Sequence, residues 1–239
     1  MSSEPVVILT RPSGENARVA ARLAAHGIAS HELPCVELRA LEDPAPLRDA
    51  VRALTPDDLL IITSRAGARA VAAALDGRPC AAPVAAVGAA TASACREAGL
   101  RVTFTPAIPS GVSLATDVPL PRGRILLARS DRAAHEPVTI LAARGATVGE
   151  VVAYRTAPVA PTEPVPAGAI AVFGSPSAVE GFALSGAIGL GGVVAVGESA
   201  AARVRALLGI DPRVTGPDDD EIAAAVRGLV QETDAVAGR

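Results

Sequence analysis

The chain has 239 residues, of which 50% are hydrophobic, and a formal net charge of −3. This length suffices for one large or two small domains with hydrophobic cores. The negative charge and the 2% of aromatic residues exclude a general nucleic-acid binder, which needs a basic surface or stacking side chains. All 22 basic residues are arginine, so Schiff-base catalysis, pyridoxal phosphate attachment and a lysine-containing phosphate loop are excluded too.

The sequence also leads to expectations about the protein's cellular location, its partners and its cysteines. The sequence has no apolar run of about eighteen residues and no basic, apolar start of the signal-peptide type. We therefore expect a cytoplasmic, monomeric protein that binds neither a membrane nor nucleic acid. Cys35, Cys80 and Cys95 are odd in number and lack CxxC spacing, so we expect no disulfide and no metal site.

Short apolar runs alternate with helical patterns from the start of the chain. Residues 5–12 predict a buried strand, residues 14–27 have the spacing of an amphipathic helix that ends at a glycine, and residues 28–34 predict a second strand. Strand, helix and strand in so short a stretch predict a parallel unit with a right-handed crossover.

The alternation resumes after a stretch without pattern at residues 34–46. We expect strands over residues 58–64, 83–88, 100–106, 123–130, 146–154, 169–175, 192–197 and 212–217. We expect helices over residues 43–54, 65–75, 89–99, 110–118, 135–145, 176–186, 198–209 and 218–230. Alternation of this kind predicts open parallel sheets with helices on both faces, an α/β fold.

The sequence also aligns with itself. The segment from Arg11 to Gly27 matches the segment from Arg129 to Gly145, with sixteen residues from arginine to glycine in both. LLIITSRAGARAVAAAL matches IAVFGSPSAVEGFAL, and VAAVGAATASACREAG matches VVAVGESAAARVRALLG. A tandem duplication predicts two similar α/β domains.

Two low-complexity stretches, at residues 34–46 and 155–168, indicate where the domains are divided. They predict a central domain of residues 41–153, inserted into a domain made of residues 1–36 and 158–239. The linkers then lie near residues 34–41 and 153–160, and we expect Tyr154, the single tyrosine, to face a cleft between the domains. Because the chain crosses twice between them, we also expect a hinge.

Polar residues follow the expected strand ends in both repeats. In an open parallel sheet, ligands bind beyond these ends, where helix N-termini present free N–H groups. The candidate binding residues are Arg11, Thr63, Ser64, Arg65, Gly88, Thr91, Arg129, Ser175, Ser177, Gly197 and Ser199. If both domains turn these residues toward one cleft, it binds a polyanion through arginine and N–H groups. For the serines and threonines taken singly, the alternative is a plain helix N-cap.

The ordered segments VVILTRP, LLIITSRAGARAV, VAAVGAATA, GRILLARS, GEVVAYRT, IAVFGSPSAV and VVAVGESAA resemble the motif set of the uroporphyrinogen-III synthase family. The resemblance extends from Val6 to about Val230. It implies two flavodoxin-like parallel-sheet domains joined by a two-stranded linker, with the central domain inserted into the terminal one. It also implies an enzyme without a cofactor.

The implied reaction starts from hydroxymethylbilane, a linear tetrapyrrole that carries acetate and propionate groups. The enzyme removes the terminal hydroxyl as water, inverts ring D through a spiro intermediate and closes uroporphyrinogen III, a precursor in haem, sirohaem and cobalamin biosynthesis. Tyr154 occupies the family's vYrT position, which implies that its hydroxyl donates a hydrogen bond to the leaving group. From the residues alone, the alternative is an amphipathic side chain half-buried at a linker.

One position departs from the family's pattern. The second glycine turn usually reads G-x-x-T-A, but here Ala200 follows Gly197 where the threonine belongs, whereas the first repeat keeps Thr91. Either Ser199 or a backbone N–H group replaces the hydroxyl, or one carboxylate contact is lost. We expect Ala200→Thr to be tolerated, because a helix N-terminus accepts threonine. The departure leaves open a second hypothesis, a non-catalytic sensor that binds a small anion or tetrapyrrole in the same cleft.

Overall fold

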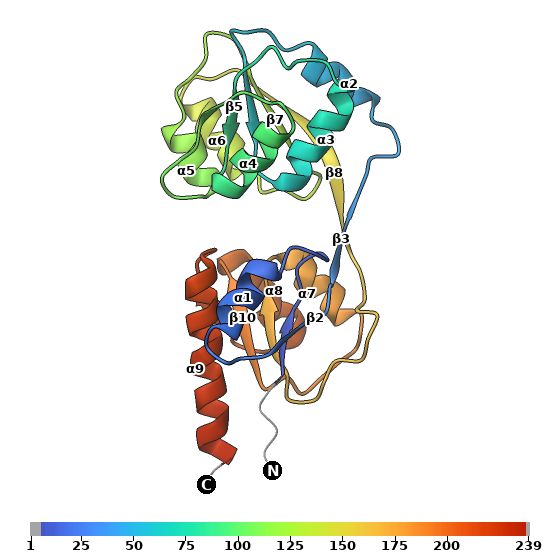
Figure 1. Ribbon diagram of the computed structural model, residues 1–239, viewed down its shortest axis with the longest axis vertical. Coiled ribbons are helices and arrows are strands. Elements are labelled where there is room, and N and C mark those ends of the chain that lie inside the picture. The colour runs from blue at the N-terminus through green and yellow to red at the C-terminus, as the bar shows by residue number, and fades with distance from the viewer. Residues whose placement is uncertain (1–5, 238–239) are drawn as a thin grey trace. The chain divides into compact units, whose positions relative to one another are not determined.

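The computed structural model describes the backbone of residues 6–237 and the side chains of residues 6–233 (Figure 1). The chain divides into two compact units. The terminal unit comprises Met1–Glu37 and Ala157–Arg239, and the central unit comprises Leu38–Thr156. Within the described residues, none of the helices combines the length and the apolar character that crossing a membrane requires.

The terminal unit is built on a five-stranded sheet in the order β11-β10-β9-β1-β2, and its neighbouring strands are parallel. Its elements are β1 (Val7–Leu9), α1 (Ala17–Ala24), β2 (Ser30–Glu32), β9 (Ile170–Phe173), α7 (Pro176–Ala183), β10 (Gly192–Val196), α8 (Glu198–Leu208), β11 (Arg213–Thr215) and α9 (Asp219–Ala237). Numbered along this unit, the strands have the order 2-1-3-4-5, which is the flavodoxin-like order.

The central unit has a six-stranded sheet in the order β3-β8-β7-β4-β5-β6. Its elements are β3 (Val36–Arg39), α2 (Ala45–Arg52), β4 (Leu59–Ile62), α3 (Arg65–Leu75), β5 (Val84–Ala86), α4 (Ala89–Glu97), β6 (Val102–Phe104), α5 (Gly111–Asp117), β7 (Ile125–Ser130), α6 (Glu136–Ala143) and β8 (Val148–Pro158). The five strands from β8 to β6 are parallel. If β7 is counted first, they repeat the order 2-1-3-4-5, with β3 added at the edge.

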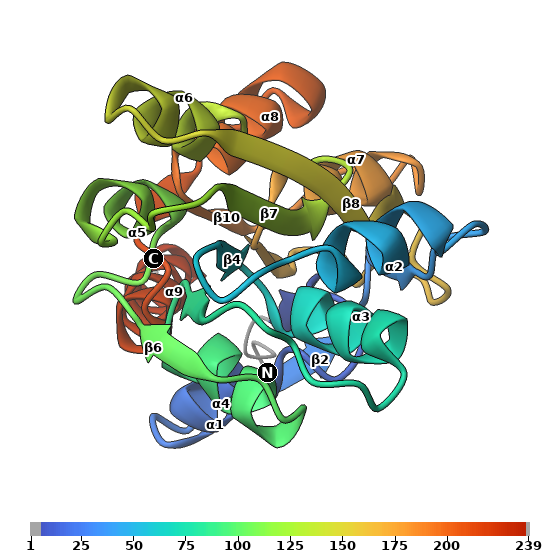
Figure 2. The ribbon, with the colours of Figure 1, turned by 90° about the horizontal axis from the view of Figure 1, so that it is seen from above.

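The strands of the central sheet are buried on both faces, as parallel sheets usually are. Leu60 and Ile62 of β4 pack in a core under α2, α3 and α4, whereas Leu59 and Ile61 pack in a second core under α5 and α6. Figure 2 shows these two groups of helices on opposite sides of the strands. The prediction of an α/β protein with parallel sheets is therefore confirmed.

The expected elements are present, and the main difference lies at the unit boundaries. β3 occupies a stretch expected to lack pattern, and β8 continues past Tyr154 to Pro158. The boundaries after residues 37 and 156 fall inside these two strands, which are neighbours in one sheet. Pairing with a strand more than a hundred residues away satisfies the backbone of β3, and no local sequence pattern reports such pairing.

Next to these strands, helix α7 of the terminal unit approaches the backbone closely. The N–H of Val159 donates to the carbonyl oxygen of Cys35 at 3.1 Å. A Cβ atom on Gly181 of α7 would overlap that oxygen and lie 2.6 Å from the carbonyl oxygen of Val159. Only glycine therefore lets α7 pack against both chain segments.

We expect Gly181→Ala to lower the free energy of unfolding by about 1–3 kcal/mol, because a methyl group forced against backbone oxygens makes α7 shift. Urea titration followed by circular dichroism measures the change. Gly149→Ala is the control, since its new Cβ atom would have its nearest neighbour at 3.8 Å. Equal stabilities of the two variants would contradict the close approach.

Candidate functional site

In the terminal unit, the predicted residues lie at the carboxyl ends of β1, β9 and β10, which share one edge because the strands are parallel. Arg11 follows β1, and its guanidinium lies 3.5 Å from a carboxylate oxygen of Asp219. Ser175 and Ser177 are at the start of α7, and Ser199 is exposed in the first turn of α8.

In the central unit, the corresponding residues follow β4 and β5. Thr63 and Arg65 are half-buried on either side of the cap of α3. Gly88 caps α4, and a Cβ atom there would lie 2.9 Å from the Cβ of Pro109. Thr91 is buried in the first turn of α4. This edge therefore offers helix N–H groups with one arginine beside them.

Two of the predicted serines are helix N-caps. The Ser64 hydroxyl oxygen accepts from the N–H of Gly67 at 2.9 Å, and that of Ser175 accepts from the N–H of Ala178 at 3.3 Å. Each cap satisfies one N–H group at a helix end, and α7 begins with Pro176, which has no N–H group. The capping alternative is thus correct for both side chains, while the helix ends that they fix remain suited to anions.

Arg129 is buried in the central unit, although its repeat partner Arg11 is only partly buried. Its guanidinium pairs with Glu150 of β8 at 2.5 Å and donates to the carbonyl oxygen of Ala134 at 2.7 Å. His135 approaches the other oxygen of Glu150 at 3.4 Å. Arg129 therefore joins β7, β8 and the turn before α6, and a contact with substrate stays a prediction.

Tyr154 owes its orientation to an irregularity in β8. Arg129 pairs with Val152 and the next residue, Ser130, pairs with Tyr154, so Ala153 is an extra residue in β8. Regular alternation would place Tyr154 on the face opposite Ala153. Instead, both contact the core under α2 and α3, as expected when a bulge re-aims a side chain.

A polar clamp, formed by Ser130, Asp131 and Thr156, holds this part of β8. The N–H of Asp131 donates to the carbonyl oxygen of Tyr154 at 3.3 Å. The carboxylate of Asp131 accepts from the N–H of Thr156 at 2.9 Å, and the hydroxyls of Ser130 and Thr156 are 2.7 Å apart. The clamp thus fixes the backbone on both sides of Arg155.

We expect Asp131→Ala to accelerate amide hydrogen exchange at Thr156 and to destabilise the protein by about 0.5–1.5 kcal/mol, because the N–H group loses a charged acceptor that water only partly replaces at this exposed site. Exchange followed by mass spectrometry or NMR measures the effect. Asp117→Ala, at an exposed position at the end of α5, is the control. Unchanged protection at Thr156 would mean that the clamp does not hold β8.

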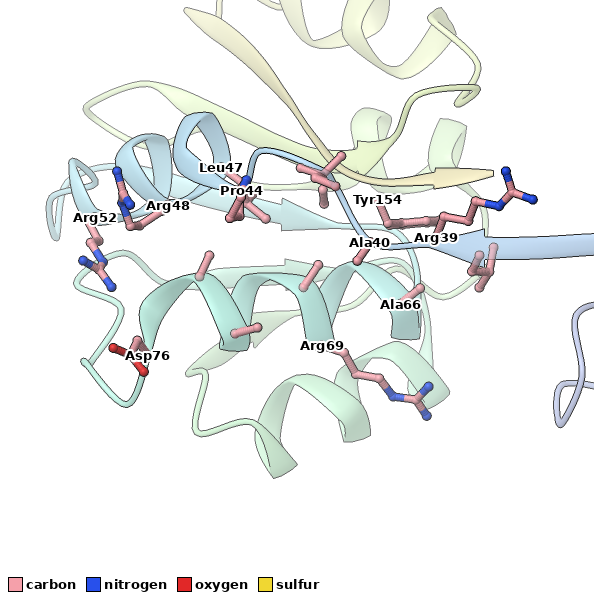
Figure 3. Close-up of a pocket in the computed structure, with 16 residues that line it drawn as sticks. Arg39, Ala40, Pro44, Leu47, Arg48, Arg52, Ala66, Arg69, Asp76 and Tyr154 are labelled. Carbon is pink, nitrogen blue, oxygen red and sulfur yellow. The ribbon is translucent and has the colours of Figure 1, made fainter. Parts of the chain in front are cut away.

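Tyr154 also lines a pocket of about 690 Å³ that lies wholly within the central unit (Figure 3). Its walls come from α2, α3 and residues 38–41. The walls are mainly alanine and leucine side chains, with four arginines around them: Arg39, Arg48, Arg52 and Arg69. The arginines of α2 and α3 were not among the predicted site residues, because a helix with arginines on its polar face normally has that face in solvent. The signal was the i, i+4 spacing of Arg48 and Arg52 in α2.

Metal and thiol chemistry find no support among the described residues. They contain no group of three or more histidine, cysteine, aspartate or glutamate side chains that could hold a metal ion. Burial raises the pKa of the Cys35 thiol to about 12 and that of Cys95 to about 11. Both thiols therefore stay protonated near neutral pH and are poor nucleophiles.

The departure at the second glycine turn has a structural explanation. Ala200 is fully buried in the first turn of α8. Glu198 pairs with Arg205 at 2.6 Å on the exposed surface of the same helix. The burial of Ala200 argues against the expected tolerance of threonine there, because its extra atoms have no open space to enter.

We now expect Ala200→Thr to lower the free energy of unfolding by about 1–3 kcal/mol through overpacking. The control is Ala202→Thr, at an exposed position of α8, which carries the same change in helix propensity. Chemical denaturation of both variants measures the difference. If Ala200→Thr is as stable as the control, the site has room for the hydroxyl.

Comparison with known proteins shows which family the chain belongs to. A family model described as uroporphyrinogen-III synthase HemD matches residues 17–207, most of the chain. The chain belongs to the uroporphyrinogen-III synthase family. A uroporphyrinogen-III synthase of Synechococcus elongatus is 31% identical over 170 residues, which are 65% of this chain and 64% of the relative. The match thus spans slightly less than two thirds of the relative's length, and it confirms the resemblance read from the motifs.

Solved structures of uroporphyrinogen III synthases share the fold. A mutant enzyme of Thermus thermophilus superposes with a TM-score of 0.57 at 22% identity, and covers 95% of this chain and 99% of its own. The enzyme of Helicobacter pylori gives a TM-score of 0.58 at 17% identity, and covers 99% of this chain and 100% of its own. At these identities the likeness extends to the fold alone.

Proposed function

We propose that this protein is a uroporphyrinogen-III synthase, a lyase that converts hydroxymethylbilane into uroporphyrinogen III. The observation that carries the proposal is the family match over residues 17–207, which includes the segment of Tyr154. The reaction needs no group that the chain lacks, because loss of water gives a delocalised cation that cyclises without help. The task of the protein is then to hold the chain of rings so that ring D inverts, which is catalysis by orientation.

The substrate's carboxylates need many hydrogen-bond donors, and each unit has such donors at the carboxyl-end edge of its own sheet. In this proposal, the helix N-termini of α3, α4, α7 and α8 bind carboxylates through their N–H groups, with Arg11 and Arg65 beside them. The proposal keeps the expectation, drawn from the sequence, that the donors of both units bind one substrate. Because binding is spread over many donors, the loss of any single donor weakens binding without abolishing it.

Tyr154 has a different part in the proposal. Its phenol donates a hydrogen bond to the departing hydroxyl and so stabilises the charge that develops on that oxygen. The half-burial of Tyr154 and its contact with the core under α2 and α3 support this part, since a fixed donor costs little reorganisation. A partly apolar setting also strengthens the hydrogen bond.

The proposal predicts that the wild-type protein turns freshly prepared hydroxymethylbilane into the rearranged isomer, uroporphyrinogen III. Chromatography of the oxidised products separates this isomer from the unrearranged one that forms spontaneously. A mixture identical to the protein-free control would sink the proposal, and would leave a non-catalytic binding protein.

Steady-state kinetics of four variants separate the roles. We expect Tyr154→Phe to reduce kcat by at least about tenfold with little change in KM, because a leaving-group contact forms fully only in the transition state. Arg11→Gln and Arg65→Gln should instead raise KM. In each variant the increase should correspond to a loss of about 1–3 kcal/mol of binding free energy. Arg129→Gln breaks the pair with Glu150 and should mainly lower stability. An unchanged kcat in Tyr154→Phe would remove the phenol from the chemistry.

A further inference from the structure

The pocket beside Tyr154 is a groove that runs along α3 (Figure 3). It follows the helix from Ala66 to the C-cap Asp76, a span of ten residue steps, which corresponds to about 15 Å at the rise of an α-helix. Tyr154 and Arg39 lie at one end of the groove in Figure 3, whereas Arg48 and Arg52 lie at the other end, near Asp76. The groove is thus longer than a single pyrrole ring with its arms.

The charge around the groove is opposite to that of the whole chain. Four arginines line it against one carboxylate, Asp76, although the chain carries a net charge of −3. One of the four, Arg48, also pairs with Asp49 just outside the lining, at 2.9 Å. A local excess of positive charge attracts a ligand that carries several carboxylates.

The two arginines at the far end have unused hydrogen-bonding capacity. Arg52 is exposed and donates to the carbonyl oxygen of Leu75 at 3.5 Å, the upper limit for a hydrogen bond. Arg48 contacts its neighbour Asp49 through Nε at 2.9 Å. Each guanidinium has five N–H groups, so both retain donors for a carboxylate. Between the two ends, the walls formed by Leu47 and the alanines of α3 suit the face of a pyrrole ring.

We propose that this groove anchors the part of hydroxymethylbilane that does not react. A pyrrole ring remote from the leaving hydroxyl packs on the apolar wall, and its acetate and propionate arms pair with Arg48 and Arg52. The inference rests on the proposed function, because it places the reacting end of the same substrate at Tyr154. An anchor at the far end of the groove limits the number of folds that the linear chain can adopt.

The test compares two double variants that each remove two positive charges from the central unit. Arg48→Gln/Arg52→Gln removes the anchor, and Arg101→Gln/Arg122→Gln, at exposed positions outside the groove, is the control. We expect KM to rise about 10- to 100-fold in the first, with kcat lowered as well because the anchor also orients the chain, and both constants to stay within about twofold of the wild type in the control. Arg48→Lys/Arg52→Lys should restore part of the affinity, because it restores the charge but not the planar fork.

A binding experiment without turnover separates this inference from the proposed function. The probe is a monopyrrole with one acetate and one propionate arm, titrated into the labelled wild-type protein and into both double variants. We expect NMR shifts at amides of α2 and α3 that weaken with added salt and disappear in Arg48→Gln/Arg52→Gln. These shifts would support the groove even if the wild type proved inactive on hydroxymethylbilane.

Two results would overturn the inference. One is an active wild type whose KM is the same in both double variants, which leaves the proposed function intact. The other is a monopyrrole that shifts only amides outside α2 and α3, or that binds Arg48→Gln/Arg52→Gln as well as it binds the wild type. Circular dichroism of the variants confirms that the exposed substitutions leave the fold unchanged.

Discussion

The candidate site depends on one extra residue in β8. Because Ala153 has no partner of its own in β7, Tyr154 lies on the same face as Ala153 rather than opposite it. That face is the one that α2 and α3 cover, and it is where the arginine-lined groove lies. Without the bulge, the phenol would belong to the other side of the sheet, away from the arginines of the groove.

Two further features hold this geometry in place. The clamp of Ser130, Asp131 and Thr156 ties the backbone after the bulge to the turn that follows β7. The pair of buried Arg129 and exposed Glu150 joins the same two strands just before the bulge. Both sets of contacts lie inside the central unit.

The sequence predicts most of the fold because its signals are local. Apolar runs define the strands, and glycines such as Gly27 and Gly145, with positive φ angles of 73° and 88°, mark helix ends. The internal repeat also predicts the likeness of the two units, and the strand orders bear out that likeness. What escaped prediction depends on distant partners. Neither β3, nor the bulge at Ala153, nor the pairing of Arg129 with Glu150 has a local signature.

The site was predicted in the same uneven way. Parallel topology predicts where residues such as Arg11 and Ser64 lie, at the carboxyl ends of strands, whereas their contact with a substrate stays a prediction. Arg48 and Arg52 were missed, since only the packing of α2 beside α3 turns a polar helix face into the wall of a groove. Ala200 shows the opposite error, because the motif suggested a contact position and the packing makes it a core position.

The central claim is that Tyr154 acts on the departing hydroxyl while other groups hold the substrate. A crystal structure with a substrate analogue that keeps this hydroxyl but cannot release it tests the claim most directly. We predict that the phenol oxygen of Tyr154 lies about 2.6–3.2 Å from the analogue's hydroxyl oxygen. An analogue bound with its hydroxyl far from Tyr154, or bound to another face of the central unit, would contradict the account.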